Sequence, residues 1–174
     1  AERVDAPHVG QQGVPDVISL GIGEPDYSAP WRAREAAIYA LEHGRTNYTS
    51  NLGQPRLRRA IARYLREQHG LLYDPESEIL VTVGVSEALD LVLRAILDPG
   101  DEVIIPAPFF VEYLSYVDHH GGVVKRVKSK GDFSLDLWAI EEAVTEKTKA
   151  VLINTPNNPT GRVYDEASIR ALAS

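Results

Sequence analysis

Ile79-Leu-Val-Thr-Val83 is the first of four short β-branched runs that decide the fold of this chain. The other three are Glu102-Val-Ile-Ile105, Val123-Val-Lys-Arg-Val127 and Ala150-Val-Leu-Ile153. Between the runs, apolar residues recur at helical spacing, as at Leu89, Leu93 and Ile96. This alternation predicts an α/β fold, with a mostly parallel sheet and helices on both faces. The first and last runs are almost entirely apolar, so we expect both strands to be buried on both faces.

The first 77 residues have a different pattern. Residues 30–43 and 56–68 have the periodicity of helices, and a polar, turn-rich segment separates them. We therefore divide the chain into an N-terminal arm with lead-in helices, residues 1–77, and an α/β domain, residues 78–174. A last helix starts near Asp165 and is cut at Ser174. Because a sheet of four parallel strands would also leave unpaired backbone groups at its edges, we expect the sequence to be part of a longer chain.

Composition narrows the classes of function. The 174 residues carry 18 Lys and Arg against 25 Asp and Glu, a net charge of −7, so we expect no nucleic-acid partner. Apolar runs stay well short of the roughly 20 residues that span a bilayer, and the first residues lack a signal-peptide pattern, which predicts a cytoplasmic protein without a membrane partner. The absence of cysteine excludes disulfides, thiolate zinc sites and a cysteine nucleophile within this sequence.

The segment Gly84-Val85-Ser86 lies between the first predicted strand and its helix. The backbone N–H groups at a helix N-terminus, together with the helix dipole, form a site suited to phosphate. The Ser86 hydroxyl can bind a phosphate oxygen or cap the helix. Taken alone, the segment fits an ordinary capped helix better than a phosphate site.

Two loops follow later strands, at the edge where open α/β sheets bind ligands. Pro106-Ala-Pro-Phe-Phe-Val-Glu-Tyr113 offers an aromatic face to a planar ring, although its aromatic side chains also suit the core. Asn154-Thr-Pro-Asn-Asn-Pro-Thr-Gly161 holds Asn158 before a proline, in a stiff and extended position. Its amide can then bind a ligand oxygen with little loss of entropy, and a plain turn is the alternative.

Five motifs in order along the chain resemble the class I/II aminotransferases, the pyridoxal-phosphate family with the aspartate aminotransferase fold (fold type I). They are Gly-Ile-Gly-Glu-Pro-Asp-Tyr at 21–27, Asn-Tyr-Thr-Ser-Asn-Leu-Gly-Gln-Pro-Arg-Leu-Arg at 47–58, the helix start at Gly84, Asp-Pro-Gly-Asp-Glu-Val-Ile-Ile-Pro at 98–106 and Pro-Asn-Asn-Pro-Thr-Gly at 156–161. The resemblance implies the N-terminal half of such an enzyme. Residues 78–174 would open its cofactor-binding large domain, and residues 1–77 would contribute to the small domain and a dimer contact.

The resemblance also implies roles for individual residues. The backbone at Gly84, Val85 and Ser86 would hold the phosphate of pyridoxal 5'-phosphate. Phe110 matches the aromatic residue that stacks on the pyridine ring, and Asn158 matches the asparagine that binds the ring's 3-oxygen, next to the substrate.

Two further matches lie nearer the N-terminus. Gly23 matches the glycine beside the substrate carboxylate, and Tyr48 matches the tyrosine that reaches the cofactor phosphate of the neighbouring subunit. The resemblance therefore implies a homodimer. The family's Schiff-base lysine, its aspartate on the pyridine nitrogen and its carboxylate-binding arginine would all lie beyond Ser174.

The implied activity is transfer of an amino group from an amino acid to a 2-oxo acid, completed by residues beyond Ser174. Two alternatives stay open: a C–S β-lyase of the same fold, and a non-catalytic aminotransferase-like module. We expect no metal site, because His119 and His120 have no ligand set around them in the sequence.

Overall fold

A computed structural model of the chain describes Gly23, Pro25 and residues 27–174. The chain divides into two compact units, Ala1–Thr49 and Ser50–Ser174. In the first unit, helix α1 spans Trp31–Glu42 and begins directly after Pro30, which confirms the helix predicted at 30–43. The second unit holds every strand that the structure describes.

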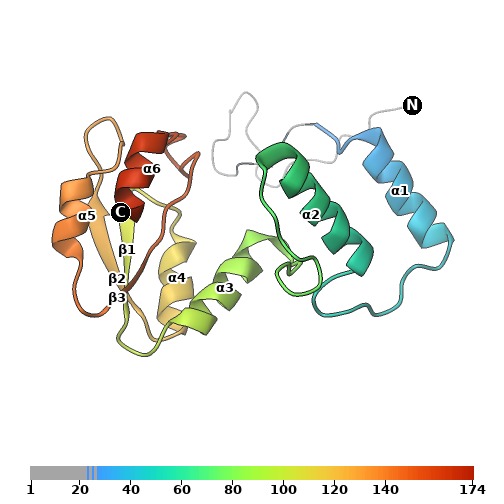
Figure 1. The fold of residues 1–174 in the computed structure, drawn as a ribbon, viewed down its shortest axis with the longest axis horizontal. Coiled ribbons are helices and arrows are strands. Elements are labelled where there is room, and N and C mark those ends of the chain that lie inside the picture. The colour runs from blue at the N-terminus through green and yellow to red at the C-terminus, as the bar shows by residue number, and fades with distance from the viewer. Residues whose placement is uncertain (1–22, 24, 26) are drawn as a thin grey trace, which may run out of the picture. The chain divides into compact units, whose positions relative to one another are not determined.

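The second unit begins with a long helix and continues as alternating helices and strands (Figure 1). Its elements are α2 (Pro55–His69), α3 (Gly84–Ile96), β1 (Glu102–Ala107), α4 (Glu112–His119), β2 (Val123–Lys128), α5 (Leu137–Ala143), β3 (Thr148–Val151) and α6 (Glu166–Ala173). α6 begins after Asp165, whose side chain accepts a hydrogen bond from the N–H of Ser168. The alternation predicted from the sequence is confirmed from β1 onward.

The three strands form a parallel sheet in the order β2-β1-β3. β1 and β2 pair in register from Glu102 opposite Val123 to Ala107 opposite Lys128. The pairing of β1 with β3 continues one residue past the last strand residue, because the N–H of Leu152 donates to the carbonyl of Ile104 at 2.9 Å. The loops that follow β1 and β3 therefore leave the same edge of the sheet.

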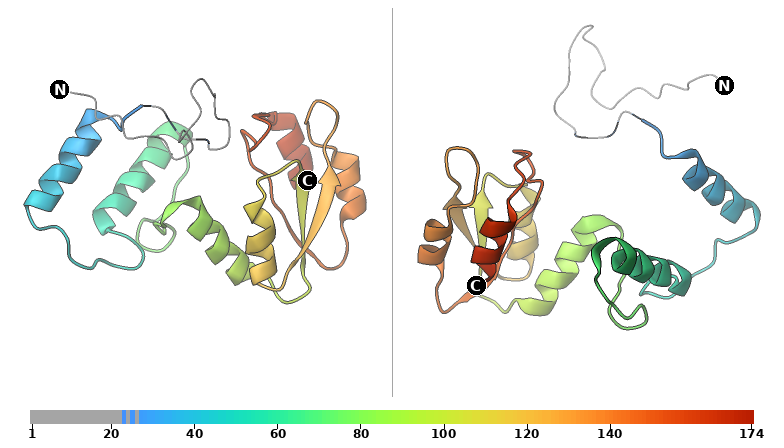
Figure 2. Two further views of the ribbon diagram at one scale, coloured as in Figure 1. Left: turned by 180° about the vertical axis from the view of Figure 1, so that it is seen from behind. Right: turned by 45° about the horizontal axis from the view of Figure 1, so that its top comes forward.

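Helices cover both faces of the central strand β1, as predicted. Val103 and Ile105 belong to one apolar cluster and Ile104 belongs to another, because successive side chains of a strand point to opposite faces. The first cluster adds Leu93, Leu97, Tyr113 and Val117 from α3, its end and α4; the second adds Val127, Leu135, Ile140 and Tyr164. Figures 1 and 2 show α4 and α5 on opposite sides of the strands.

The prediction of a strand at Ile79–Val83 is wrong. These residues form no strand, and Leu80 and Val83 are 48% and 88% exposed, so the expected burial on both faces is also wrong. A β-branched run becomes a strand only if its backbone groups pair with a neighbour; β1 is paired on both sides, and the run 79–83 does not pair with the outer edge of β2 or of β3. Ile79–Val83 is instead joined to another segment by a hydrogen bond from the N–H of Val81 to the carbonyl of Leu52 at 3.1 Å.

The division at residue 77 that we inferred from the sequence stays a prediction. The structure groups α2 with the sheet, in the unit that starts at Ser50. Among the described residues, no helix combines the length and apolar character that crossing a membrane requires.

Candidate functional site

The first turn of α3 lies on the surface of the second unit. Gly84 opens the helix with φ +75°, in the left-handed region that favours glycine, and Val85 is 72% exposed. The residue before the helix is Val83, whose side chain has no oxygen, so Ser86 lies within the first turn and is not the N-cap. The N–H groups of Gly84, Val85 and Ser86 have no carbonyl four residues earlier within the helix, which leaves donors available to an anion.

Two polar side chains fix the start of α3. The Glu87 carboxylate accepts a hydrogen bond from the N–H of Val83, and the Thr82 hydroxyl donates to the carbonyl of Gly84 at 2.9 Å. Glu87 was not among the residues predicted from the sequence, although an acidic residue in a first helical turn is a recognisable signal. Because Glu87 uses the N–H just before the helix, the predicted phosphate donors are the next three along the chain.

The loop after β1 places its aromatic residues partly in the core. The ring of Phe110 meets that of Tyr113 edge to face, with 5.7 Å between centroids and an angle of 81°, and Phe109 lies 6.3 Å from the same ring. Burial raises the pKa of the Tyr113 phenol, so this hydroxyl stays neutral. Phe110 is half-buried, so it contributes to packing and retains part of its surface for a ligand.

The loop after β3 is joined to the loop after β1 by Asn157. This side chain is buried, and its Nδ2 donates to the carbonyl of Pro108 at 3.1 Å and to the hydroxyl of Thr160 at 2.9 Å. Asn158 is exposed, and its N–H donates to Oδ1 of Asn154 at 2.8 Å. The structure therefore brings the Phe110 and Asn158 loops together at the carboxyl edge of the sheet. In the Ser50–Ser174 unit, no hydrogen bond joins either loop to the first turn of α3.

Asn157 was not identified by the sequence analysis. Two adjacent asparagines in a proline-rich loop gave no indication of which one is buried, because that depends on the position of the Pro108 carbonyl, 49 residues earlier. Asn157 orients the backbone from which Asn158 extends, so one asparagine serves structure and its neighbour remains available to a ligand.

Replacing Asn157 with alanine is expected to destabilise the protein by about 2 kcal/mol, because the carbonyl of Pro108 loses its donor. The same change at exposed Asn158 should lower the free energy of unfolding by about 0.5 kcal/mol or less. Urea denaturation of both variants measures the difference. Equal losses would contradict the assignment of the structural role to Asn157.

Gly23 and Tyr48 belong to the other unit, Ala1–Thr49. Both are exposed, and a Cβ added to Gly23 would meet no atom within 4 Å. Of the motif at 21–27, residues 21, 22, 24 and 26 lie outside the described residues. The predicted roles of Gly23 and Tyr48 stay predictions.

An ion pair of the sheet includes the residue that begins β1, at the other edge. Lys125 Nζ pairs with Oε1 of Glu102 at 3.5 Å, and Glu102 is the first residue of β1. A hydrogen bond from the Thr145 hydroxyl, followed by the nearby charge of Lys125, lowers the pKa of Glu102. In the described part of the chain, no group of three or more His, Asp and Glu side chains is arranged to hold a metal ion.

Comparison with known proteins identifies the family. The model of the family "Aminotransferase class I and II" matches residues 15–174. The chain is 43% identical over 175 residues to the aspartate/prephenate aminotransferase of Thermus thermophilus, covering 99% of this chain and 45% of the relative. It is 44% identical over 163 residues to the aspartate aminotransferase of Pyrococcus abyssi, covering 92% and 42%.

Solved structures that match this chain are also aminotransferases. The structure of an aromatic aminotransferase from Pyrococcus horikoshii matches with a TM-score of 0.87 and 42% identity, covering 92% of this chain and 43% of that one. The aspartate aminotransferase of Thermus thermophilus, solved with maleate, matches with a TM-score of 0.83 and 45% identity, covering 87% and 40%. The chain thus spans less than half the length of these relatives. It belongs to the class I and II aminotransferases, a family whose members use pyridoxal phosphate.

Proposed function

We propose that this chain is the cofactor-binding part of a pyridoxal-phosphate-dependent aminotransferase, a cytoplasmic enzyme that moves an amino group from an amino acid to a 2-oxo acid. The observation that carries the proposal is the exposed first turn of α3, which starts at a left-handed glycine and offers three N–H donors and a hydroxyl. That donor set suits a phosphate dianion.

The residues present fit the rest of the cofactor as well. Half-buried Phe110 would stack on the pyridine ring, and exposed Asn158 would donate its amide to the ring's 3-oxygen. When bound, pyridoxal phosphate supplies an electron sink for the negative charge that develops at Cα of the amino acid. The task of this chain is to hold the phosphate and orient the ring. Asn157 supports that task by keeping the loop after β3 attached to the loop after β1.

The remaining roles belong to segments outside Ser50–Ser174. Gly23 would leave room for the substrate carboxylate, and Tyr48 would bind the cofactor phosphate of a second copy in a homodimer. A lysine beyond Ser174 would hold the cofactor and move the proton at Cα, and an arginine there would bind the substrate carboxylate. The names of the relatives include aspartate, aromatic amino acids and prephenate, which is a 2-oxo acid; this supports aspartate or an aromatic amino acid as the donor.

The test uses the full-length protein, incubated with pyridoxal phosphate and aspartate or tyrosine as donor. We expect more than one equivalent of 2-oxo acid per bound cofactor to form from the donor only when an acceptor such as 2-oxoglutarate is added, with no release of ammonia. A parallel assay offers a substrate with a Cβ–S bond, such as cystathionine; release of a thiol, ammonia and 2-oxo acid from it without an acceptor would identify a β-lyase instead. A full-length protein that binds no pyridoxal phosphate, measured by the cofactor's visible absorbance, would indicate a non-catalytic module.

A further inference from the structure

The segment 79–83 leads directly into the proposed phosphate site, yet no strand partner holds it. Its position therefore depends on contacts made by the residues around it. Besides Glu87 and Thr82, which fix the start of α3, the stretch 50–58 makes two contacts among the described residues, one with this segment and one with the turn before it. This stretch contributes neither to the sheet nor to the proposed site.

The first contact is made by the turn at Ser50–Gly53. The carbonyl of Ser50 accepts from the N–H of Gly53 at 2.9 Å, and its hydroxyl accepts from the N–H of Leu52 at 3.2 Å. The carbonyl of Leu52 then accepts from the N–H of Val81 at 3.1 Å. The turn thus holds the backbone of the segment three residues before Gly84.

Gly53 makes this close approach possible. Its φ of +91° lies in the left-handed region, and a Cβ added there would lie 2.6 Å from Cβ and 2.7 Å from Cγ2 of Val81. Both backbone conformation and space therefore require glycine. Any side chain at this position would displace the segment that precedes α3.

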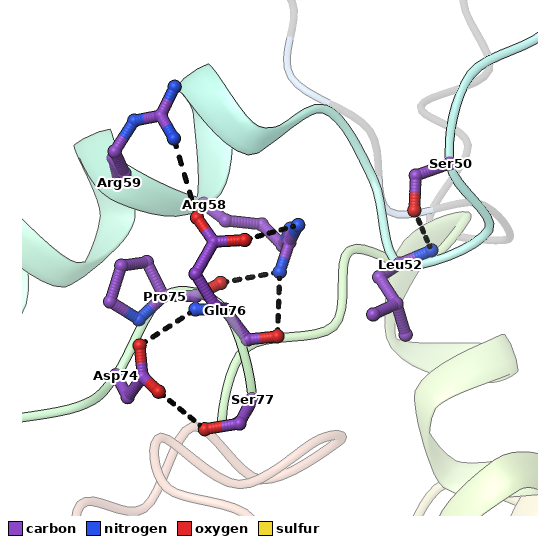
Figure 3. A network of polar contacts seen from close by, with 8 residues as sticks. All are labelled: Ser50, Leu52, Arg58, Arg59, Asp74, Pro75, Glu76 and Ser77. Carbon is purple, nitrogen blue, oxygen red and sulfur yellow. Dashed lines mark hydrogen bonds and ion pairs between the residues drawn. The ribbon is translucent and has the colours of Figure 1, made fainter.

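The second contact is made by Arg58 of α2. Arg58 is only 4% exposed; its Nη1 donates to the carbonyls of Pro75 and Glu76, and its Nη2 lies 3.4 Å from Oε2 of Glu76 (Figure 3). A buried arginine with backbone carbonyl acceptors fixes a turn more rigidly than an exposed ion pair does.

Asp74 closes the same turn from within. Its carboxylate accepts from the Ser77 hydroxyl at 2.7 Å and from the N–H of Glu76 at 2.9 Å. These two bonds lower the pKa of Asp74, so it stays ionised near neutral pH. These hydrogen bonds therefore fix the conformation of the turn that directly precedes the segment 79–83.

We infer that Gly53 and Arg58 are positioning residues for cofactor binding: together they hold residues 75–81, and thereby set where the phosphate-binding turn of α3 begins. The inference rests on the proposed function, and it assigns a task to the motif at 47–58 beyond that of Tyr48. Neither residue is assigned a contact with the cofactor. Both act through the backbone that leads to Gly84.

The test compares Gly53→Ala with Gly70→Ala in the full-length protein. Gly70 also has a positive φ, +69°, but a Cβ there meets no atom within 4 Å. Alanine at position 70 therefore introduces a similar backbone strain without a steric clash. We measure the affinities for pyridoxal phosphate and for pyridoxal, which lacks the phosphate, together with the unfolding temperature. Gly53→Ala should weaken pyridoxal phosphate binding about tenfold and change pyridoxal binding much less, while Gly70→Ala should bind both with nearly the parent affinity.

A rescue variant separates positioning from general destabilisation. Val81→Gly removes the carbon atoms that the new Cβ would meet, so adding it to Gly53→Ala should restore most of the lost phosphate affinity. If Gly53→Ala does not fold, Arg58→Gln replaces it, with Arg59→Gln as control, since Arg59 is exposed and, among the described residues, pairs with Glu76 Oε1 at 3.3 Å. Arg58→Gln should then lower phosphate affinity several-fold more than Arg59→Gln.

The outcomes distinguish this inference from the proposed function. If the parent protein binds pyridoxal phosphate and the Gly53 and Arg58 variants bind it equally well, the inference is overturned and the proposed function stands. If the parent protein itself shows no preference for the phosphorylated form, the phosphate site at α3 is wrong, and the inference is overturned with it.

Discussion

Ser86→Asp is expected to weaken binding of pyridoxal phosphate to the full-length protein about a hundredfold, equivalent to about 2.8 kcal/mol. The substitution places a carboxylate in the first turn of α3, where the phosphate dianion is proposed to bind. The same negative charge interacts favourably with the N-terminal end of the helix dipole. The protein without cofactor should therefore be as stable as the parent or slightly more stable, so affinity and stability should move in opposite directions.

Ser86→Asn is the matched control, because asparagine has nearly the size of aspartate and no charge. We expect it to weaken binding less than tenfold. Titration followed by the visible absorbance of the cofactor gives the affinities, and thermal unfolding without cofactor gives the stabilities. Equal affinities for both variants and the parent would place the phosphate away from α3.

Ile104→Ala is expected to lower the free energy of unfolding by about 4 kcal/mol. Ile104 belongs to the second apolar cluster and is 0% exposed. It lies in the central strand β1, with β2 and β3 on either side. Removing its branched side chain leaves a cavity that the sheet cannot close, because β2 and β3 hold the backbone of β1 from both sides.

Val123→Ala is the control for Ile104→Ala. Val123 begins the neighbouring strand β2, but it is 47% exposed, so its truncation should lower the free energy of unfolding by about 1 kcal/mol or less. Ile104→Val, which removes one methyl group, should also cost about 1 kcal/mol, well below the loss for Ile104→Ala. Urea denaturation ranks the three variants. A loss at Val123 as large as that for Ile104→Ala would contradict the two-sided core.

Much of the fold could be predicted because β1 and β2 can each be recognised from their own residues and the turn residues beside them. The run at 102–105 is apolar on both faces and sits between turn signals, so its strand follows from the sequence alone. The run at 79–83 looks the same, but whether it pairs depends on the availability of a neighbouring strand, which a local pattern does not contain.

The site shows the same division between local and distant information. The helix start at Gly84 could be predicted, because its signals lie within a few residues. The burial of Asn157 and the contact of Gly53 with Val81 could not, because each depends on a partner 28 or more residues away along the chain. The residues proposed to touch the cofactor could therefore be predicted from the sequence, and those that hold them in place could not.

The most direct test of the central claim is the position of the cofactor in an experimental structure of the full-length protein with pyridoxal phosphate bound. We predict that the phosphate oxygens lie about 3 Å from the backbone nitrogens of Gly84, Val85 and Ser86. We also expect the pyridine ring against Phe110 and the Asn158 amide at its 3-oxygen. A phosphate bound elsewhere, with the first turn of α3 left to solvent, would contradict the account.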